Sequence, residues 1–171
     1  MANALSDYLE SGLLNYLFRG YSFPKPENIS IALTSGVPQD AHTGAGQLYT
    51  GVTNSLPELC SGIDYLGKPT LGAQSSGTGY SRVTLGAPSN ERWSYVSDDW
   101  DTGSGVIRNS GQIIFNTALT DWGWVSGVAL VDNSTIGTGN LLMWAELDNP
   151  RLIYTGDNVK FDVGTLEISF K

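Results

Sequence analysis

The chain has little of what most metalloproteins and secreted scaffolds depend on. Its 171 residues include one cysteine, Cys60, and one histidine, His42. A single cysteine excludes an internal disulfide, and with it a disulfide-stapled secreted fold. A single histidine removes the sites that need several imidazole groups. We therefore interpret His42 as a surface loop residue and Cys60 as a small buried apolar group.

Basic residues are also scarce. Nine Lys and Arg stand against 17 Asp and Glu, a formal charge of −8. Because phosphate binding needs a basic surface, nucleic acid is not an expected partner. No run of about 18 apolar residues occurs, so no membrane-spanning helix is expected. Residues 1–4 carry no basic segment leading into an apolar one, so we expect no secretory signal and folding in the cytoplasm where the chain is made.

Short alternating segments dominate the second half of the chain. Apolar and polar residues alternate with a period of two between turns rich in Gly, Asn and Asp, which indicates strands with one buried and one solvated face. The expected strands are 122–131, 140–147, 151–155, 158–163 and 166–170, with a break at 148–150. Strands at this spacing predict one domain, 1–171: an antiparallel β-sandwich, jelly-roll-like, with one N-terminal helix and long loop excursions.

That helix is predicted over residues 7–19. Asp7 with Glu10 three residues later resembles a capping box, and Gly20 is typical of a helix end. The apolar stripe consists of Leu5, Leu9, Leu13, Tyr16 and Leu17. The favoured interpretation is a helix that covers one open end of the β core. The alternative is that its exposed flank, with Arg19 and Tyr21, docks on a neighbouring subunit.

Two irregular stretches, 35–79 and 86–105, interrupt the strand pattern. The strands expected around them are 29–34, 80–85 and 106–115, the last with a bulge or turn at 109–111. A patternless stretch as long as 35–79 is unusual in a compact domain, and its scattered Leu and Tyr residues are too apolar for a disordered linker. We expect an ordered excursion that packs partly on its own domain and partly on a partner. Because it lies outside the strands, deletion of 36–77 is expected to leave a folded domain.

No constellation in the sequence predicts chemistry. The acidic cluster at 98–101 lacks the length and terminal Glu of a calcium loop, so we interpret it as a solvated turn. An aromatic set could stack sugars but is more typical of a core or interface: Trp93, Tyr95, Trp100, Trp122 and Trp124. The spacing of the carboxylates Glu10, Glu58, Glu91, Glu146 and Glu167 pairs no two of them. We expect no enzyme, with no catalytic, cofactor-binding or metal-binding residues.

The order of these segments resembles a family of small virion structural proteins of tailed bacteriophages, often labelled tail fibre or minor structural protein. The resemblance rests on an opening helix with a Phe-Arg-Gly-like corner, a first strand, a Gly-Tyr-Ser-Arg corner, and a block that begins Thr-Asp-Trp-Gly. The corresponding residues are 5–20, 29–34, 79–83, 120–123, 127–130 and 139–142. Longer than the family pattern are 35–79 and the stretch around 93–101.

The resemblance implies a structural virion protein. The leading expectation is a capsid cement or decoration protein on the outer capsid surface that stabilises the phage head by bridging capsid subunits. Its partners would be the major capsid protein and copies of itself, as a homo-oligomer, either dimer or trimer. The alternative is a tail-associated fibre or adaptor with host-glycan contact. A third hypothesis is a carbohydrate-binding or carbohydrate-active module. No cofactor is expected.

Overall fold

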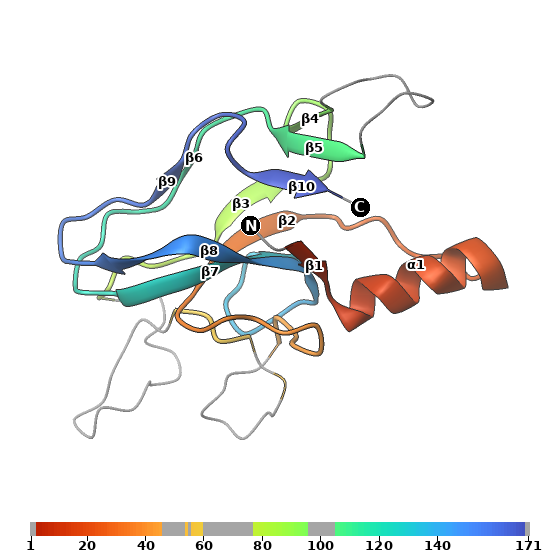
Figure 1. Ribbon diagram of the computed structural model, residues 1–171, viewed down its shortest axis with the longest axis horizontal. Coiled ribbons are helices and arrows are strands. Elements are labelled where there is room, and N and C mark those ends of the chain that lie inside the picture. Colours follow the sequence, from red (N-terminus) through yellow and green to blue (C-terminus); the bar gives the residue numbers. More distant parts are fainter. Residues whose placement is uncertain (1–2, 46–53, 55, 60–76, 96–104, 170–171) are drawn as a thin grey trace.

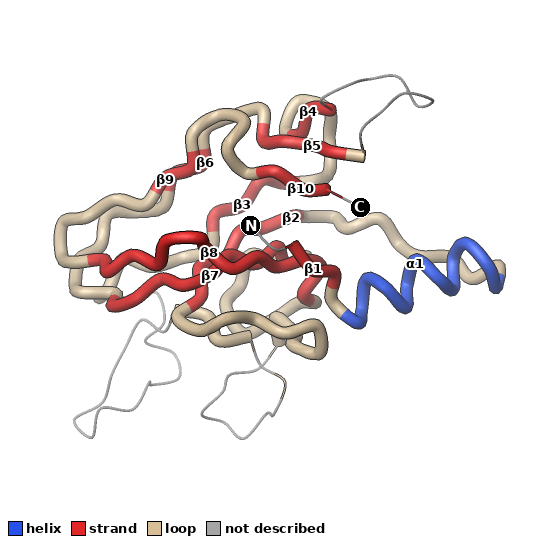
Figure 2. The backbone as a smooth tube through the Cα atoms, viewed as in Figure 1, coloured by secondary structure: helices blue, strands red, loops and turns tan. Residues whose placement is uncertain are grey.

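The computed structural model describes residues 3–45, 54, 56–59, 77–95 and 105–169. These residues form one helix and ten strands, most of them short (Figures 1 and 2). The elements are β1 (Asn3–Leu5), α1 (Asp7–Arg19), β2 (Ile29–Thr34), β3 (Val83–Gly86), β4 (Trp93–Tyr95), β5 (Val106–Asn109), β6 (Ile113–Ile114), β7 (Gly123–Val131), β8 (Leu141–Ile153), β9 (Lys160–Phe161) and β10 (Glu167–Ser169). The predicted helix and the strand at 29–34 are confirmed to the residue.

The strands form three antiparallel sheets. The largest has the order β1-β8-β7-β2-β3, and the smaller ones are β10-β5-β4 and β6-β9. The fold is therefore mainly β and antiparallel, as predicted. The specific jelly-roll sandwich is not confirmed, because two of the three sheets have only two or three short strands. One of these, β4, lies inside the stretch 86–105 that the sequence indicated to be irregular.

The main core lies between the five-stranded sheet and the two smaller sheets. Alternate residues of β2, Ile31 and Leu33, face this core and are fully buried. From the other side come Ile113 and Phe115 around β6 and Leu166 just before β10. Figure 1 shows the smaller sheets above one face of the large one. Burial of these side chains, at about 25 cal/mol per Å² of apolar surface, is what holds the sheets together.

The opposite face of the large sheet is also covered. Ala32 in β2 and Ala129 in β7 pack with Leu56, which belongs to the excursion 35–79. An isolated bridge joins Thr34 to Glu58, and the Leu59 N–H donates to the Leu33 carbonyl at 3.0 Å. The described part of the excursion therefore packs on its own domain, as expected. The face of β2 that carries Ala32 and Thr34 is therefore buried as well as the face toward the main core.

Strand β8 runs through the predicted break at 148–150. Opposite the single residue Ser126 of β7 lie four residues of β8, 147–150, between the pairs Gly127–Glu146 and Val125–Arg151. The Asp-Asn-Pro segment thus forms an outward bulge within one strand rather than a turn between two. The turn prediction failed because pairing resumes on the same partner strand after the bulge. Proline is tolerated there, since it removes no ladder hydrogen bond.

The N-cap of helix α1 is Ser6, one residue before Asp7, which the sequence indicated as the start of the capping box. The Ser6 hydroxyl accepts the Leu9 N–H at 3.2 Å and donates to the Leu141 carbonyl of β8. The cap thereby ties the helix to the large sheet. Gly20 ends the helix with φ +70, the left-handed conformation that glycine adopts without strain. In the part of the chain that the structure describes, no helix is long and apolar enough to cross a membrane.

Gly123, at the start of β7, provides a test of the turn that precedes the core strands. Its φ is +78, and a Cβ built on it would meet no atom within 4 Å, so only backbone strain opposes a side chain. Valine is β-branched and strongly disfavours positive φ. We expect Gly123→Val to lower the free energy of unfolding by about 1–3 kcal/mol, measured by urea denaturation.

Gly111→Ala is the matched control, because Gly111 has no positive φ and equally open surroundings. Its urea midpoint should stay within error of the parent. An unchanged midpoint for Gly123→Val would show that the turn relaxes without cost. Asp121→Ala should destabilise less, through loss of the hydrogen bonds that the Thr155 N–H and hydroxyl donate to Asp121. These bonds hold the pKa of the Asp121 carboxyl below its usual value.

Candidate functional site

A buried ion pair is the most polar feature of the interior. Arg82, just before β3, and Glu58, from the excursion, meet in a two-pronged contact: Nε donates to Oε1 at 2.9 Å and Nη2 to Oε2 at 2.7 Å. The side chain of Arg82 is fully buried and that of Glu58 is 7% exposed. The planar guanidinium matches a carboxylate in this way, so the pair is fixed in orientation as well as in charge.

The remaining N–H groups of Arg82 bind backbone carbonyls. Nη1 donates to the carbonyls of Asn133 and Thr138 at 2.8 and 2.9 Å, and Nη2 donates to the carbonyl of Gly44 at 3.2 Å. All five donors of the guanidinium are thereby used. Since Gly44 lies in the excursion and the other two lie in the β7–β8 connection, one side chain fastens two loops to the sheet.

Tyr80 completes this cluster. Its hydroxyl donates to Glu58 Oε1 at 2.9 Å and accepts the Leu33 N–H at 3.0 Å. Its ring lies parallel to that of Phe115 at 6.4 Å and edge-on to Trp122 at 5.5 Å. Complete burial, with the nearby Glu58 carboxylate, raises the pKa of the phenol well above its usual value. We call Tyr80, Arg82 and Glu58 the hub.

The hub is built for structure rather than for chemistry. Its charged and polar atoms are bonded to each other or to the backbone inside the core, so no reacting group has access to them. The sequence offered no partner for Glu58, whereas the structure pairs it with Arg82. The expected strand 80–85 includes Tyr80 and Arg82, but the sequence did not indicate their partner, because Glu58 lies 24 positions away from Arg82 in a stretch without periodicity.

The other carboxylates considered from the sequence lie on separate elements. Glu10 is exposed on α1, Glu91 lies in the loop before β4, and Glu146 is exposed on β8. Glu167 in β10 binds Arg108 in β5, with 2.8 Å between Nη2 and Oε2. Within the described ranges no group of three or more His, Cys, Asp and Glu residues is placed to hold a metal ion. The acidic cluster 98–101 lies outside the described residues, as does Cys60.

The aromatic residues are divided between core and surface. Trp93 and Trp122 pack against the main core, and the Trp122 indole N–H donates to the Thr78 carbonyl at 2.8 Å. Trp124 is 57% exposed on β7. Trp100 lies outside the described residues. The structure therefore places Trp93 and Trp122 in the core rather than on an exposed stacking platform.

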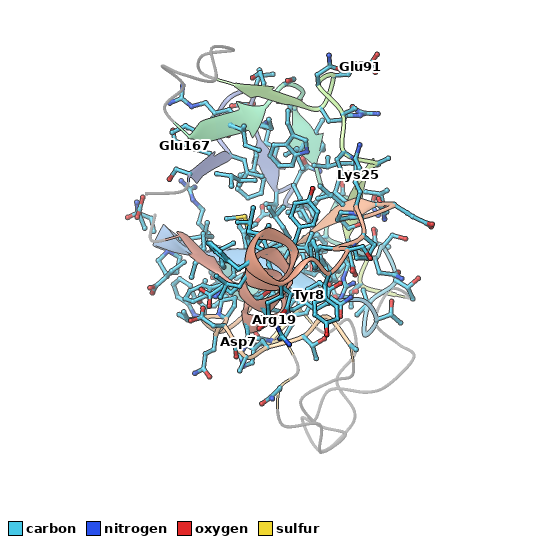
Figure 3. The ribbon with its side chains drawn as sticks, turned by 90° about the vertical axis from the view of Figure 1, so that its right-hand side faces the viewer. Asp7, Tyr8, Arg19, Lys25, Glu91 and Glu167 are labelled. Atoms are coloured by element: carbon cyan, nitrogen blue, oxygen red, sulfur yellow. The ribbon has the colours of Figure 1, made fainter. Side chains whose placement is uncertain are left out.

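The first turns of α1 are attached to the body. Leu9 packs against the main core, and Tyr8 contacts the Phe23 ring at 5.6 Å. A Cβ on Gly12 would lie 2.1 Å from the Phe23 ring, so Gly12 allows the returning chain to pass close to the helix. The helix nevertheless contains no fully buried residue. Figure 3 views α1 end-on, in front of the sheets.

The last turns of α1 extend past the large sheet (Figures 1 and 2). Their large apolar side chains are exposed. We call these side chains, with the tyrosine that follows Gly20, the α1 tip. Its members are Leu14 (58% exposed), Tyr16 (57%), Leu17 (64%), Phe18 (79%) and Tyr21 (59%). Leu14, Leu17 and Phe18 lie on one side of the helix at i, i+3 and i+4, and an exposed apolar patch of this kind marks an interaction site. The favoured prediction of a helix that covers the core therefore holds for its first turns, and the exposed flank of the alternative prediction is present in its last ones.

A groove of about 650 Å³ opens at the bulge of β8. It is lined by Leu147, Asp148, Arg151, Asp157, Asn158 and Phe161, among others. Two of its polar groups are engaged locally: Asp157 accepts the Tyr154 N–H at 2.9 Å, and Asn158 donates to the Phe115 carbonyl at 2.6 Å. These bonds hold the turn before β9. The groove is thus lined by both acidic and basic residues, and two of its polar side chains already bind groups of the protein itself.

Most of the chain is similar to a known protein family. Residues 4–55 and 65–169 match the family described as Podophage GP4 fiber I protein gp80. This match confirms the resemblance to small virion structural proteins of tailed phages. No curated protein matches the chain.

Proposed function

Because the chain belongs to the Podophage GP4 fiber I protein gp80 family, and is thus a structural protein of the virion, we propose that it acts as a fibre component of a podophage particle. It works by adhesion: a rigid β body holds out a helix whose apolar tip binds a neighbouring protein. The single observation that carries this proposal is the match, which includes α1 and two of the three hub residues, Tyr80 and Arg82.

The geometry of the hub supports a scaffold role. Arg82 fastens the excursion and the β7–β8 connection to the sheets through one fully bonded side chain. A body held in this way keeps α1 at a fixed angle, because Ser6 at its N-cap is bonded to β8. Pre-organised contact surfaces lose less entropy on binding than mobile ones. A fibre component that must assemble reproducibly benefits from this rigidity.

We propose that the protein has no enzymatic activity. The hub is closed, and the other glutamates considered from the sequence lie on separate elements. Asp148 and Asp157 both line the groove at β8, but Asp157 accepts the Tyr154 N–H and serves the turn there. A glycan contact through the groove at β8 is not part of this proposal, since two of its polar groups already bind the protein itself. The charge of −8 opposes binding to nucleic acid.

Capsid cement, the role preferred from the sequence, stays a prediction without further support. The family description names a fibre, and no described feature is specific to a capsid lattice. The same holds for the major capsid protein as a partner. The two roles differ in copy number, and this makes them separable by one measurement.

Quantified protein bands of purified virions test the proposal. A fibre component is expected at roughly a few to a few dozen copies per particle, because fibres attach at a limited number of symmetric positions. A cement protein would approach the copy number of the major capsid protein. Gold-labelled antibody should mark the tail end of the particle. Label over the whole head, with a copy number near that of the capsid protein, would contradict the fibre role.

A further inference from the structure

The α1 tip is apolar on nearly every side. In the helix 7–19, the residues from 13 to 18 read Leu-Leu-Asn-Tyr-Leu-Phe, with Asn15 as the only polar side chain. A helix on a protein surface normally has an apolar stripe toward the body and a polar stripe toward water. Here Leu14 and Phe18 lie on the side away from Leu9, which packs on the core. The body of the protein therefore leaves these apolar side chains exposed, and only a partner protein can bury them.

The polar side chains of the last turn of α1 already have partners within the tip. Arg19 donates to Asn15 Oδ1 at 2.9 Å, and its guanidinium lies 5.1 Å from the centre of the Tyr21 ring. Both polar side chains of the last turns are thus engaged with each other or with an aromatic ring. Asn15 and the Tyr21 ring are neutral, so the Arg19 guanidinium stays at the solvated edge of the contact while an apolar partner covers the carbon side chains beside it.

The exposed area is large enough for a symmetric pair. A fully covered aromatic side chain buries about 150–250 Å², and three of the five tip residues are aromatic. Tyr16 lies on the Leu9 side of the helix, so one partner can cover the other four, which offer on the order of 500 Å² per copy. Two copies packed tip to tip would bury roughly 1,000 Å², about the minimum for a specific interface.

We propose that the α1 tip is the surface through which two copies of this chain associate, helix against helix in antiparallel orientation about a two-fold axis. This proposal rests on the fibre role and names the partner of its adhesive surface. An isologous contact of this kind is self-complementary, because Leu17 and Phe18 of one copy meet the same residues of the other. Helical ridges of large apolar side chains pack readily in this way.

Charge decides the orientation of the pair. Each body carries most of a net charge of −8, whereas the only charged residue from 11 to 21 is Arg19. In a parallel pair the two acidic bodies would lie side by side. In an antiparallel pair they lie at opposite ends of two overlapping helices, each about 20 Å long, which exceeds the screening length of about 8–10 Å at moderate salt. The helix dipoles also oppose each other favourably.

The first experiment measures the mass of the purified full chain by light scattering across a concentration series. The parent should have twice the monomer mass at micromolar concentration. Leu17→Lys with Phe18→Lys should weaken association by at least about 100-fold, because two central apolar side chains are lost, while lysine keeps the helix intact. Val163→Lys is the matched control, since Val163 is 62% exposed in a turn far from α1 in sequence. It should remain a dimer.

A monomeric parent, or a double variant that stays dimeric with unchanged circular dichroism, would overturn the proposal. A mass of three or more chains would overturn the two-fold arrangement. Cysteine cross-linking adds a direct readout: in a Cys60→Ser background, Phe18→Cys should form a disulfide-linked dimer under mild oxidation, whereas Glu91→Cys should not. Cross-linking at Glu91 alone would place the contact elsewhere.

Incorporation into virions separates this inference from the fibre role. If the parent is monomeric in solution but appears in virions at fibre copy number, the self-association is wrong and the fibre role stands. If the parent is a dimer found in virions at fibre copy number, and the double variant is monomeric and missing from virions, both hold. A dimeric parent found at the copy number of the capsid protein would retain the self-association and overturn the fibre role.

Discussion

Replacing Glu58 by alanine is expected to lower the free energy of unfolding by about 3–5 kcal/mol, a large part of the 5–15 kcal/mol that a typical domain has. The substitution leaves the Arg82 guanidinium in the core with its carbonyl contacts but without a counter-charge. It also removes the shorter of the two hydrogen bonds that the Tyr80 hydroxyl can donate, leaving the Leu33 carbonyl at 3.4 Å as acceptor. Urea or thermal unfolding followed by circular dichroism measures the loss.

Two further variants show how much of this destabilisation comes from the lost charge, from the lost side-chain volume and from the burial of the pair. Glu58→Gln keeps the volume and one acceptor oxygen, so it should cost less than alanine but remain clearly destabilising. Glu167→Ala breaks the same type of pair at the surface, where the Arg108 and Glu167 side chains are 43% and 36% exposed. It should cost about 0–1 kcal/mol. Equal losses for Glu58→Ala and Glu167→Ala would mean that burial does not set the strength of the hub.

Deleting residues 36–77 and closing the gap with a short Gly-Ser linker is expected to abolish folding. The sequence alone predicted the opposite, since the segment lies outside the alternating strands. The structure argues against that prediction. Removal takes away Glu58 together with Leu56 and Leu59, which are 5% and 3% exposed, and it uncovers one face of β2 and β7. The lost burial and the orphaned Arg82 together are comparable to the whole stability of an ordinary domain.

Circular dichroism and one-dimensional NMR of the deleted chain measure this outcome. Adding Arg82→Leu to the deletion tests how much of the loss comes from the unpaired charge. If the deleted chain shows a cooperative thermal transition like the parent's, the segment is dispensable and the core assignment of Leu56 and Leu59 is wrong. A cooperative transition only with Arg82→Leu would assign the failure to the charge rather than to the lost apolar cover.

Local signals carried the prediction of individual elements. The helix 7–19, its end at Gly20 and the strand 29–34 were read correctly, because caps, glycine and periodicity act within a few residues. The bulge in β8 was not predicted. An Asp-Asn-Pro segment can form either a turn or a bulge, and which one forms depends on whether β7 continues opposite it. The missed strand β4 has only three residues and exists by pairing with β5.

By itself, the sequence determined the class of the protein: a mainly antiparallel β fold with one N-terminal helix, poor in reactive groups and similar to phage virion proteins. Composition and short-range periodicity are enough for that. Only the tertiary structure decided that Glu58 is buried against Arg82, that the excursion covers a second face of the sheet, and that the α1 tip is left bare. Each of these depends on which distant segments of the chain come into contact, and local sequence patterns do not determine the energy of such contacts.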